Sequence, residues 1–161
     1  MTAPASYSRL QIALHWLIAL LIVAAWFTDD GMGRALHNRL ESGATGFSGN
    51  TLHVWLGSAV FVLVLIRVLV RFGQGAPVPV DGPRLAQRLA LWGHRLLYLL
   101  MIAVPALGAS AWYLGIEAAG EPHELTANLL MIVALGHALV AIWHQLVRRD
   151  GTLTRMIRPG A

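Results

Sequence analysis

Six of the seven histidines lie within or beside long apolar stretches of the sequence, where ionisable side chains are costly and rare. They are His15, His53, His94, His123, His137 and His144. The chain is 57% hydrophobic, only 12% charged and free of cysteine, which excludes disulfides, thiolate catalysis and cysteine-held metal clusters. The seventh histidine, His37, lies among polar residues, and we assign it no binding role.

The spacing of these histidines predicts two facing pairs. His123 and His137 are expected on one helix, about 21 Å apart along its axis and nearly on one face, and His144 follows two turns later. His53 lies at the start of another apolar stretch. Its expected position is on the same side of the membrane as that of His123, which lies just before the last one. His15 lies on the side of His137 and His144. We therefore expect an outer pair, His53 with His123, and an inner pair, His15 with either His137 or His144. The two pairs should lie about 20 Å from each other.

Facing neutral imidazoles in a dry helical bundle favour haem b, whose iron takes one axial ligand from each of two helices. Zinc or copper usually requires three or four converging ligands, and the apolar stretches contain neither cysteine nor carboxylate. A proton relay would typically add carboxylates within the membrane. Two imidazoles on each iron leave no open coordination position, so two such haems predict transfer of single electrons across the membrane.

Four apolar stretches must position these histidines, at residues 10–27, 52–72, 89–114 and 125–147. Each reaches the length of about 20 residues that a helix needs to cross the hydrocarbon core. They predict an all-α, transmembrane four-helix bundle in a single domain over residues 1–161. The first stretch follows Arg9 as a signal peptide would, but its length and the sequence of residues 23–26 favour a true span.

The arginines predict the orientation of the bundle. All 12 basic residues are arginines, and only Arg34 and Arg39 fall on the side away from the termini. Because cytoplasmic loops carry the excess of positive charge, we expect the N- and C-termini on the cytoplasmic side of the membrane. The basic charge is then a topology signal, and no nucleic-acid partner is expected. Arg67 falls at the depth of the inner pair, where it either pairs with a haem propionate or extends to the lipid interface.

The sequence resembles the prokaryotic cytochrome b561 family over nearly the whole chain. The resemblance rests on YSRLQIALHW at 7–16, LHV at 52–54, GHRLLY at 93–98, HE at 123–124 with AN at 127–128, GHA at 136–138, His144 and DGTLTRM at 150–156. It implies an inner-membrane dihaem cytochrome b that exchanges electrons with ubiquinone.

The resemblance also implies a role for each histidine. His53 and His123 would bind the haem near the periplasm, and His15 and His137 the haem near the cytoplasm. His94 and His144 would stay unligated beside ubiquinone. The alternative for these two is an interfacial position, bonded to lipid phosphate or to backbone.

The resemblance makes superoxide the leading candidate for the electron donor. Arg34, Arg39 or a protonated His37 would attract this anion, but the outer loops hold six acidic residues against two arginines. That balance and the short outer loop after the third stretch, at residues 115–122, also suit a small periplasmic redox protein as donor. The alternative function is a haem b membrane-anchor subunit that links a partner dehydrogenase, hydrogenase or small redox protein to quinone. A haem-free metal or proton transporter is the third hypothesis.

Overall fold

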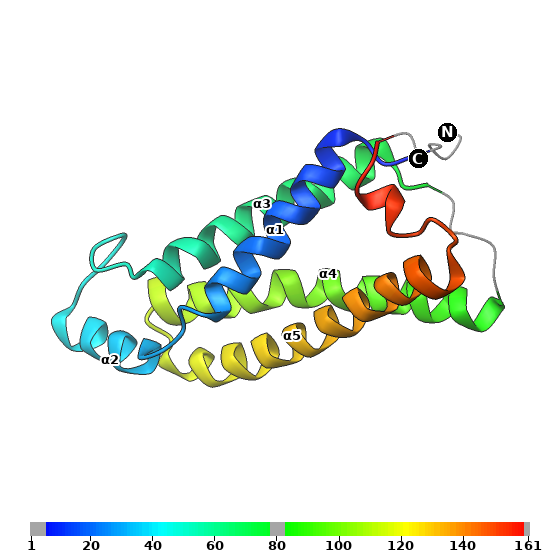
Figure 1. The fold of residues 1–161 in the computed structure, drawn as a ribbon. Coiled ribbons are helices and arrows are strands. Elements are labelled where there is room, and N and C mark those ends of the chain that lie inside the picture. Colours follow the sequence, from blue (N-terminus) through cyan, green and yellow to red (C-terminus); the bar gives the residue numbers. More distant parts are fainter. Residues whose placement is uncertain (1–5, 78–82, 160–161) are drawn as a thin grey trace.

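All regular structure in the computed structural model, which describes residues 6–77 and 83–159, is helical. The helices are α1 (Arg9–Trp26), α2 (Met32–Ser42), α3 (Leu52–Gln74), α4 (Arg84–Tyr113) and α5 (Gly120–Trp143) (Figure 1). A 3-10 turn at Glu117–Ala119 precedes α5, a π turn at His144–Arg148 follows it, and a second 3-10 turn covers Thr154–Met156. The prediction of an all-α chain is confirmed.

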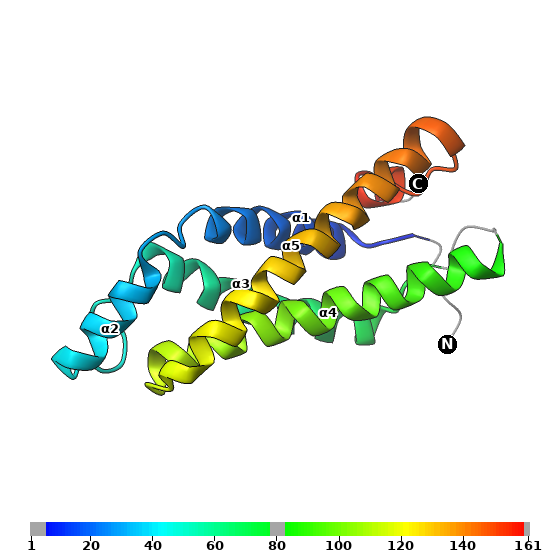
Figure 2. The same ribbon diagram turned by 90° about the horizontal axis from the view of Figure 1, so that it is seen from below.

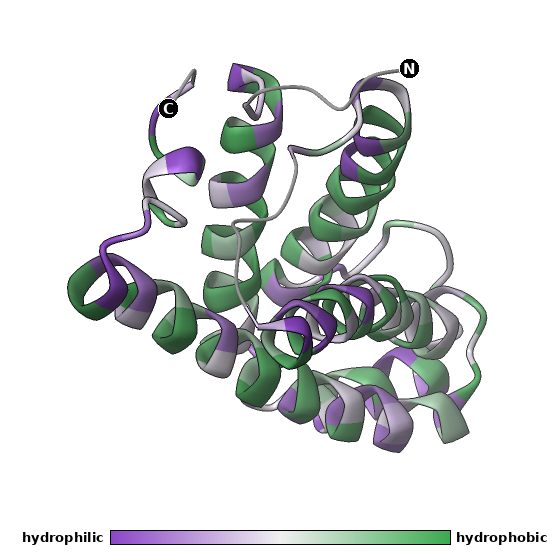
Figure 3. Ribbon diagram, turned by 90° about the vertical axis from the view of Figure 1, so that its right-hand side faces the viewer, coloured by the Kyte–Doolittle hydropathy of each residue, from purple (hydrophilic) through white to green (hydrophobic). Residues whose placement is uncertain are grey.

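Four helical segments are long and apolar enough to cross a membrane: α1, α3, α4 and the run from Glu117 to Arg148 that contains α5. Their mean hydropathy lies between 1.7 and 2.2. Apolar residues cover most of their length in Figure 3. The four predicted spans are therefore confirmed. α4 begins at Arg84 instead of residue 89, because its arginine-, alanine- and leucine-rich first turns favour a helix without being apolar throughout.

Among the four spans, α5 packs against α4 but lies apart from α1 and α3. α1 packs on α3, α3 on α4, and α4 on α5 (Figures 1 and 2). The buried core joins Leu14 and Ile18 of α1 to Val60 and Val64 of α3. By contrast, Leu130 is the single buried residue of α5. Side chains from α5 must therefore reach across open space to meet those of α1 or α3.

Two capped helix starts fix the depth of the first two histidines. Ser8 begins α1 with a capping box, in which its hydroxyl accepts from the Gln11 amide at 3.2 Å and the Gln11 side chain accepts from the Ser8 amide at 3.1 Å. Thr51 caps α3 by accepting from the Val54 amide at 3.3 Å. His53 consequently lies in the first turn of α3, at the outer end of the bundle.

α2 lies within a segment that the sequence analysis treated as an outer polar loop. Glycines with positive φ bound it, Gly31 at +76° and Gly43 at +65°. Such backbone conformations suit glycine and mark helix ends. Its buried residue is Arg39, whose Nε donates to the Trp112 carbonyl at 3.0 Å and whose Nη2 donates to the Gly46 carbonyl at 2.9 Å. The helix was missed because it is short and mostly polar, whereas the spans were found as long apolar stretches.

Both ends of the described chain lie at the end of the bundle opposite α2 (Figures 1 and 2). An even number of spans requires this arrangement. The C-terminal segment is attached to α1, because the Trp16 indole donates to the Met156 carbonyl at 2.7 Å. We call the end that carries α2 the outer end and the end that carries the termini the inner end.

Candidate functional site

The outer end of the bundle brings His53 and His123 face to face. Their ring centroids are 6.0 Å apart and their planes are nearly perpendicular, at 87°. Each Nδ1 lies against a backbone carbonyl, His53 at 2.9 Å from that of Ala25 and His123 at 2.8 Å from that of Val104. Since a carbonyl only accepts, each Nδ1 carries the proton and each Nε2 keeps a free lone pair. Metal-binding histidines are commonly oriented in this way.

The separation of the two rings suits a shared metal ion. Two imidazoles bound on opposite sides of one ion, with metal–nitrogen distances of about 2 Å, have ring centroids about 6 Å apart. The observed 6.0 Å matches that value. The residues of the outer end therefore fit a haem iron with two axial histidines.

A cavity of about 950 Å³ surrounds this pair. That volume lies at the upper end of the range of small-molecule sites, about 300–1,000 Å³. Its walls are mainly apolar and come from all five helices, including Ile22, Val60, Phe61, Met101 and Leu130. Such walls suit a large, flat and apolar ligand.

Gly108 of α4 is a determinant of this site that the sequence analysis missed. A Cβ built at this position would lie 2.9 Å from Cε1 and 3.0 Å from Nδ1 of His123. The close approach of α4 to the imidazole thus requires glycine. Gly57 of α3 also lines the cavity, and a Cβ there would meet open space. The sequence signal that could have identified Gly108 was a glycine within an apolar stretch at the depth of His123.

Carboxylates crowd the mouth of the outer cavity. Its described lining contains no arginine, but it includes Asp29, Asp30, Glu117, Glu121 and Glu124. Arg39, which was expected to help attract an anion, is buried against the Trp112 ring at 4.8 Å, and its third donor is bonded to the Ser48 carbonyl. That part of the expectation is wrong, because a guanidinium held by backbone carbonyls adds little attraction for a diffusing anion.

The inner half of the bundle brings three imidazoles together. His15 of α1 and His137 of α5 have ring centroids 6.4 Å apart, close to the separation of the outer pair. The ring of His94 of α4 also lies beside His137, with centroids 5.1 Å apart. Of the two partners that spacing allowed for His15, His137 is the one whose ring lies beside it.

Arg67 of α3 lies against the inner pair. Its Nη2 is 3.3 Å from Nδ1 of His15, and its Nη1 donates to the Gln11 carbonyl at 2.9 Å. Because a guanidinium has only donors, Nδ1 of His15 is the acceptor in this contact. The neutral His15 ring then carries its proton on Nε2, the opposite tautomer to that of the outer pair.

His144 stands apart from this group of imidazoles. It begins the π turn after α5, and its Nδ1 lies 2.5 Å from Oδ2 of Asp150. Arg149, with a φ of +53°, turns the chain back so that Asp150 reaches the ring. Hydrogen bonds from Thr152, together with the His144 contact, lower the pKa of Asp150 to about 2. In the described part of the chain, His94 and His144 make no ring contact with each other.

The chain is similar to known cytochromes along nearly its full length. The family model described as prokaryotic cytochrome b561 matches residues 6–159. Cytochrome b562 of Cereibacter sphaeroides is 43% identical over 159 residues, which cover 99% of this chain and 99% of that relative. A probable superoxide oxidase, CybB, of Yersinia pestis is 30% identical and covers 94% of this chain and 95% of its own length. Cytochrome b561 homolog 1 of Escherichia coli K12 is 27% identical over 94% of this chain and 96% of its own. No solved structure matches the chain significantly.

Proposed function

The chain belongs to the prokaryotic cytochrome b561 family, and from this premise we propose that it transfers electrons between a donor at its outer end and ubiquinone at its inner end. Membership makes it a multi-pass membrane haem protein of electron transfer. The observation that carries the proposal is the presence of two histidine pairs, with ring centroids 6.0 and 6.4 Å apart.

In this proposal the chain holds two haem b groups. His53 and His123 hold one near the outer end, and His15 and His137 hold the other near the inner end. Arg67 lies beside His15 and is the partner for a propionate of the inner haem. A haem b held by such a histidine pair would supply one-electron transfer. Mainly apolar side chains surround the outer position, and the contacts of His53 with Ala25 and of His123 with Val104 orient the outer imidazole rings.

His94 and His144 are the proposed proton donors to ubiquinone, since reduction of a quinone takes two electrons and two protons. Nδ1 of His94 lies 2.6 Å from the Ala90 carbonyl, and Nδ1 of His144 is held by Asp150. In both side chains Nε2 is the nitrogen left to hold and deliver a proton. Because the two rings are not in contact, each would serve a different part of the quinone path.

Superoxide is the first candidate for the donor, supported by the name of the Yersinia pestis relative. Two superoxide anions would each lose one electron to become O₂, and one ubiquinone would gain both electrons and two protons. The outer end then faces the periplasm, and the termini face the cytoplasm of a bacterial inner-membrane protein, as the arginine distribution predicts.

A second candidate is a haem b anchor that receives electrons from a cationic partner, a small redox protein or the redox subunit of a dehydrogenase or hydrogenase. The five carboxylates that line the mouth of the outer cavity favour it, because they attract a basic surface and repel an anion.

Stopped-flow mixing of the haem-loaded protein with superoxide, with and without ubiquinone, tests the first candidate. Fast haem reduction by superoxide, followed by reoxidation only when ubiquinone is present, is expected. A parallel experiment uses a reduced basic c-type cytochrome, for which docking on the carboxylates must weaken as salt is raised. Fast, salt-sensitive reduction by the cytochrome with slow reduction by superoxide would replace the first candidate by the second.

A further inference from the structure

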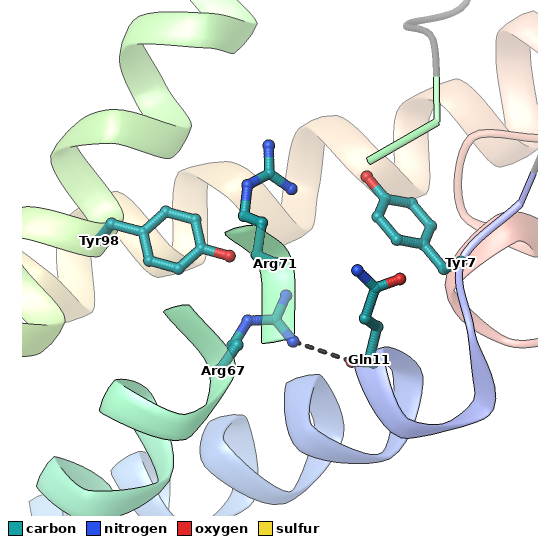
Figure 4. A pocket seen from close by; sticks show the side chains of 5 residues that line it. All are labelled: Tyr7, Gln11, Arg67, Arg71 and Tyr98. Carbon is teal, nitrogen blue, oxygen red and sulfur yellow. Dashed lines mark hydrogen bonds between the residues drawn. The ribbon is translucent and has the colours of Figure 1, made fainter. Parts of the chain in front are cut away.

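A small pocket at the inner end carries positive charge that no described carboxylate balances. Its volume is about 10 Å³, enough for one water-sized group, and it is lined by Tyr7, Gln11, Arg67, Arg71 and Tyr98. Figure 4 shows these side chains converging from the start of α1 and the segment before it, from the last turns of α3 and from α4.

Two of the lining side chains have their hydrogen bonds satisfied within the protein. The Gln11 amide accepts from the Ser8 amide and donates to the Gly75 carbonyl at 2.8 Å. Arg67 contacts the Gln11 carbonyl and His15. These contacts hold the Gln11 side chain within the protein and direct the Arg67 guanidinium toward α1 and the inner histidine pair.

The other three lining side chains offer unused donors. Arg71 lies over the Tyr98 ring, with 5.7 Å between the guanidinium carbon and the ring centroid. Within residues 6–77 and 83–159, its guanidinium and the hydroxyls of Tyr7 and Tyr98 make no hydrogen bond. A guanidinium beside two phenol groups forms a set of donors suited to an oxyanion.

The arginine charges around the pocket also favour binding of an anion. Arg67 and Arg71 are one helical turn apart on α3, a spacing at which like charges repel. Neither forms an ion pair with a carboxylate among the described residues. An anion held at Arg71 would offset this repulsion.

The depth of the pocket selects the kind of anion. Arg71 lies in the last turn of α3, and Tyr7 directly precedes the cap of α1, so both lie where apolar spans meet water. Lipid phosphates occupy this level, and basic pockets between membrane helices bind anionic headgroups. We propose that Arg71, Tyr7 and Tyr98 form a binding site for the phosphate group of an anionic phospholipid.

The test measures lipid retained by the haem-loaded full chain. The protein is placed in nanodiscs of mixed phosphatidylglycerol and phosphatidylcholine, transferred to mild detergent and analysed by native mass spectrometry. The wild type should retain phosphatidylglycerol selectively. Arg71→Gln should weaken retention about tenfold, since charge-assisted hydrogen bonds contribute about 1.5–3 kcal/mol, and Tyr98→Phe should weaken it less.

Arg95→Gln is the matched control, because Arg95 also lies over an aromatic ring, that of Trp92 at 5.0 Å, but outside the pocket. It should leave retention unchanged. Equal retention by the wild type and Arg71→Gln would overturn the proposal. So would loss of one haem from Arg71→Gln with lipid retention unchanged, which would assign the guanidinium to a haem carboxylate.

A further experiment adds inorganic phosphate to the lipid-bound protein. It should not displace the lipid at equal concentration. Phosphate binding that depends on Arg71, without selective retention of phosphatidylglycerol, would overturn the assignment to a lipid.

Discussion

The outer and inner histidine pairs have nearly the same spacing but opposite surroundings. In the outer pair, each Nδ1 faces a backbone carbonyl, and five carboxylates line the mouth of the cavity. In the inner pair, Nδ1 of His15 faces the guanidinium of Arg67, with Arg71 one turn further along α3. The comparison teaches that ring spacing alone does not define a haem site. The hydrogen bond at the second nitrogen and the nearby charge also distinguish the two pairs.

These differences predict different haem affinities and different reduction potentials for the two pairs. The outer rings already present Nε2 for binding, whereas His15 must change tautomer, with Arg67 moving away, before its Nε2 binds iron. We therefore expect the outer haem to bind more tightly. Negative charge at the outer end and positive charge at the inner end should also make the inner haem the more easily reduced. Electrons would then move from the outer to the inner end.

The largest expected effect separates the two pairs outright. His53→Ala should reduce the haem content from two to one per chain by removing the outer haem alone, because His15 and His137 are untouched. Haem quantitation and the reduced-minus-oxidised spectrum measure this, with His37→Ala as a control that keeps both. Loss of the inner haem from a folded His53→Ala protein would show that the pairing is wrong.

Gly108→Ala sharpens the comparison at the outer end. The new Cβ would meet the His123 ring at 2.9 Å, so the ring must shift and the outer haem should bind about 10–100-fold more weakly. Haem titration of the haem-free protein measures the change. Gly73→Ala is the control, because a Cβ there meets open space. Unchanged outer affinity in Gly108→Ala would remove the proposed role of the α4 contact.

Arg67→Gln tests the charge at the inner end. Removing the guanidinium should lower the midpoint potential of the inner haem by about 59 mV, a tenfold change in the electron-transfer equilibrium. Arg67→Lys should keep most of the potential, since it keeps the charge, and Arg95→Gln should not change it. A spectroscopic redox titration that finds the same inner potential in all four proteins would contradict the electrostatic difference.

The smallest effect concerns the contact between His144 and Asp150. The pKa of Asp150 is lowered from 3.8 to about 2, so its carboxylate stabilises the C-terminal turn above pH 3.8, and this stabilisation is lost as the pH falls through about 2. Asp150→Ala, which removes the acceptor of the Thr152 amide, should speed exchange of that amide hydrogen about fivefold, the value of one hydrogen bond of about 1 kcal/mol. An exchange rate equal to that of the wild type would mean that the turn is held by other contacts.

Hydropathy and helical spacing were sufficient to predict the four spans and the pairing of His53 with His123, because apolar stretches and helical spacing are local properties of the sequence. The choice between His137 and His144 stayed open because spacing gives depth but not which ring meets His15. Gly108 and the buried state of Arg39 depend on contacts between α4 and other segments, which no local pattern contains. α2 lacked the apolar signal by which the other helices were found.

The most direct test of the account is the number and kind of haem in the purified wild-type protein. Haem quantitation, combined with a reduced-minus-oxidised spectrum and electron paramagnetic resonance of the oxidised form, measures both. Two low-spin haems per chain, each with two axial histidines, are predicted. A single haem, or a high-spin haem with an open coordination position, would contradict the central claim that each histidine pair holds one iron.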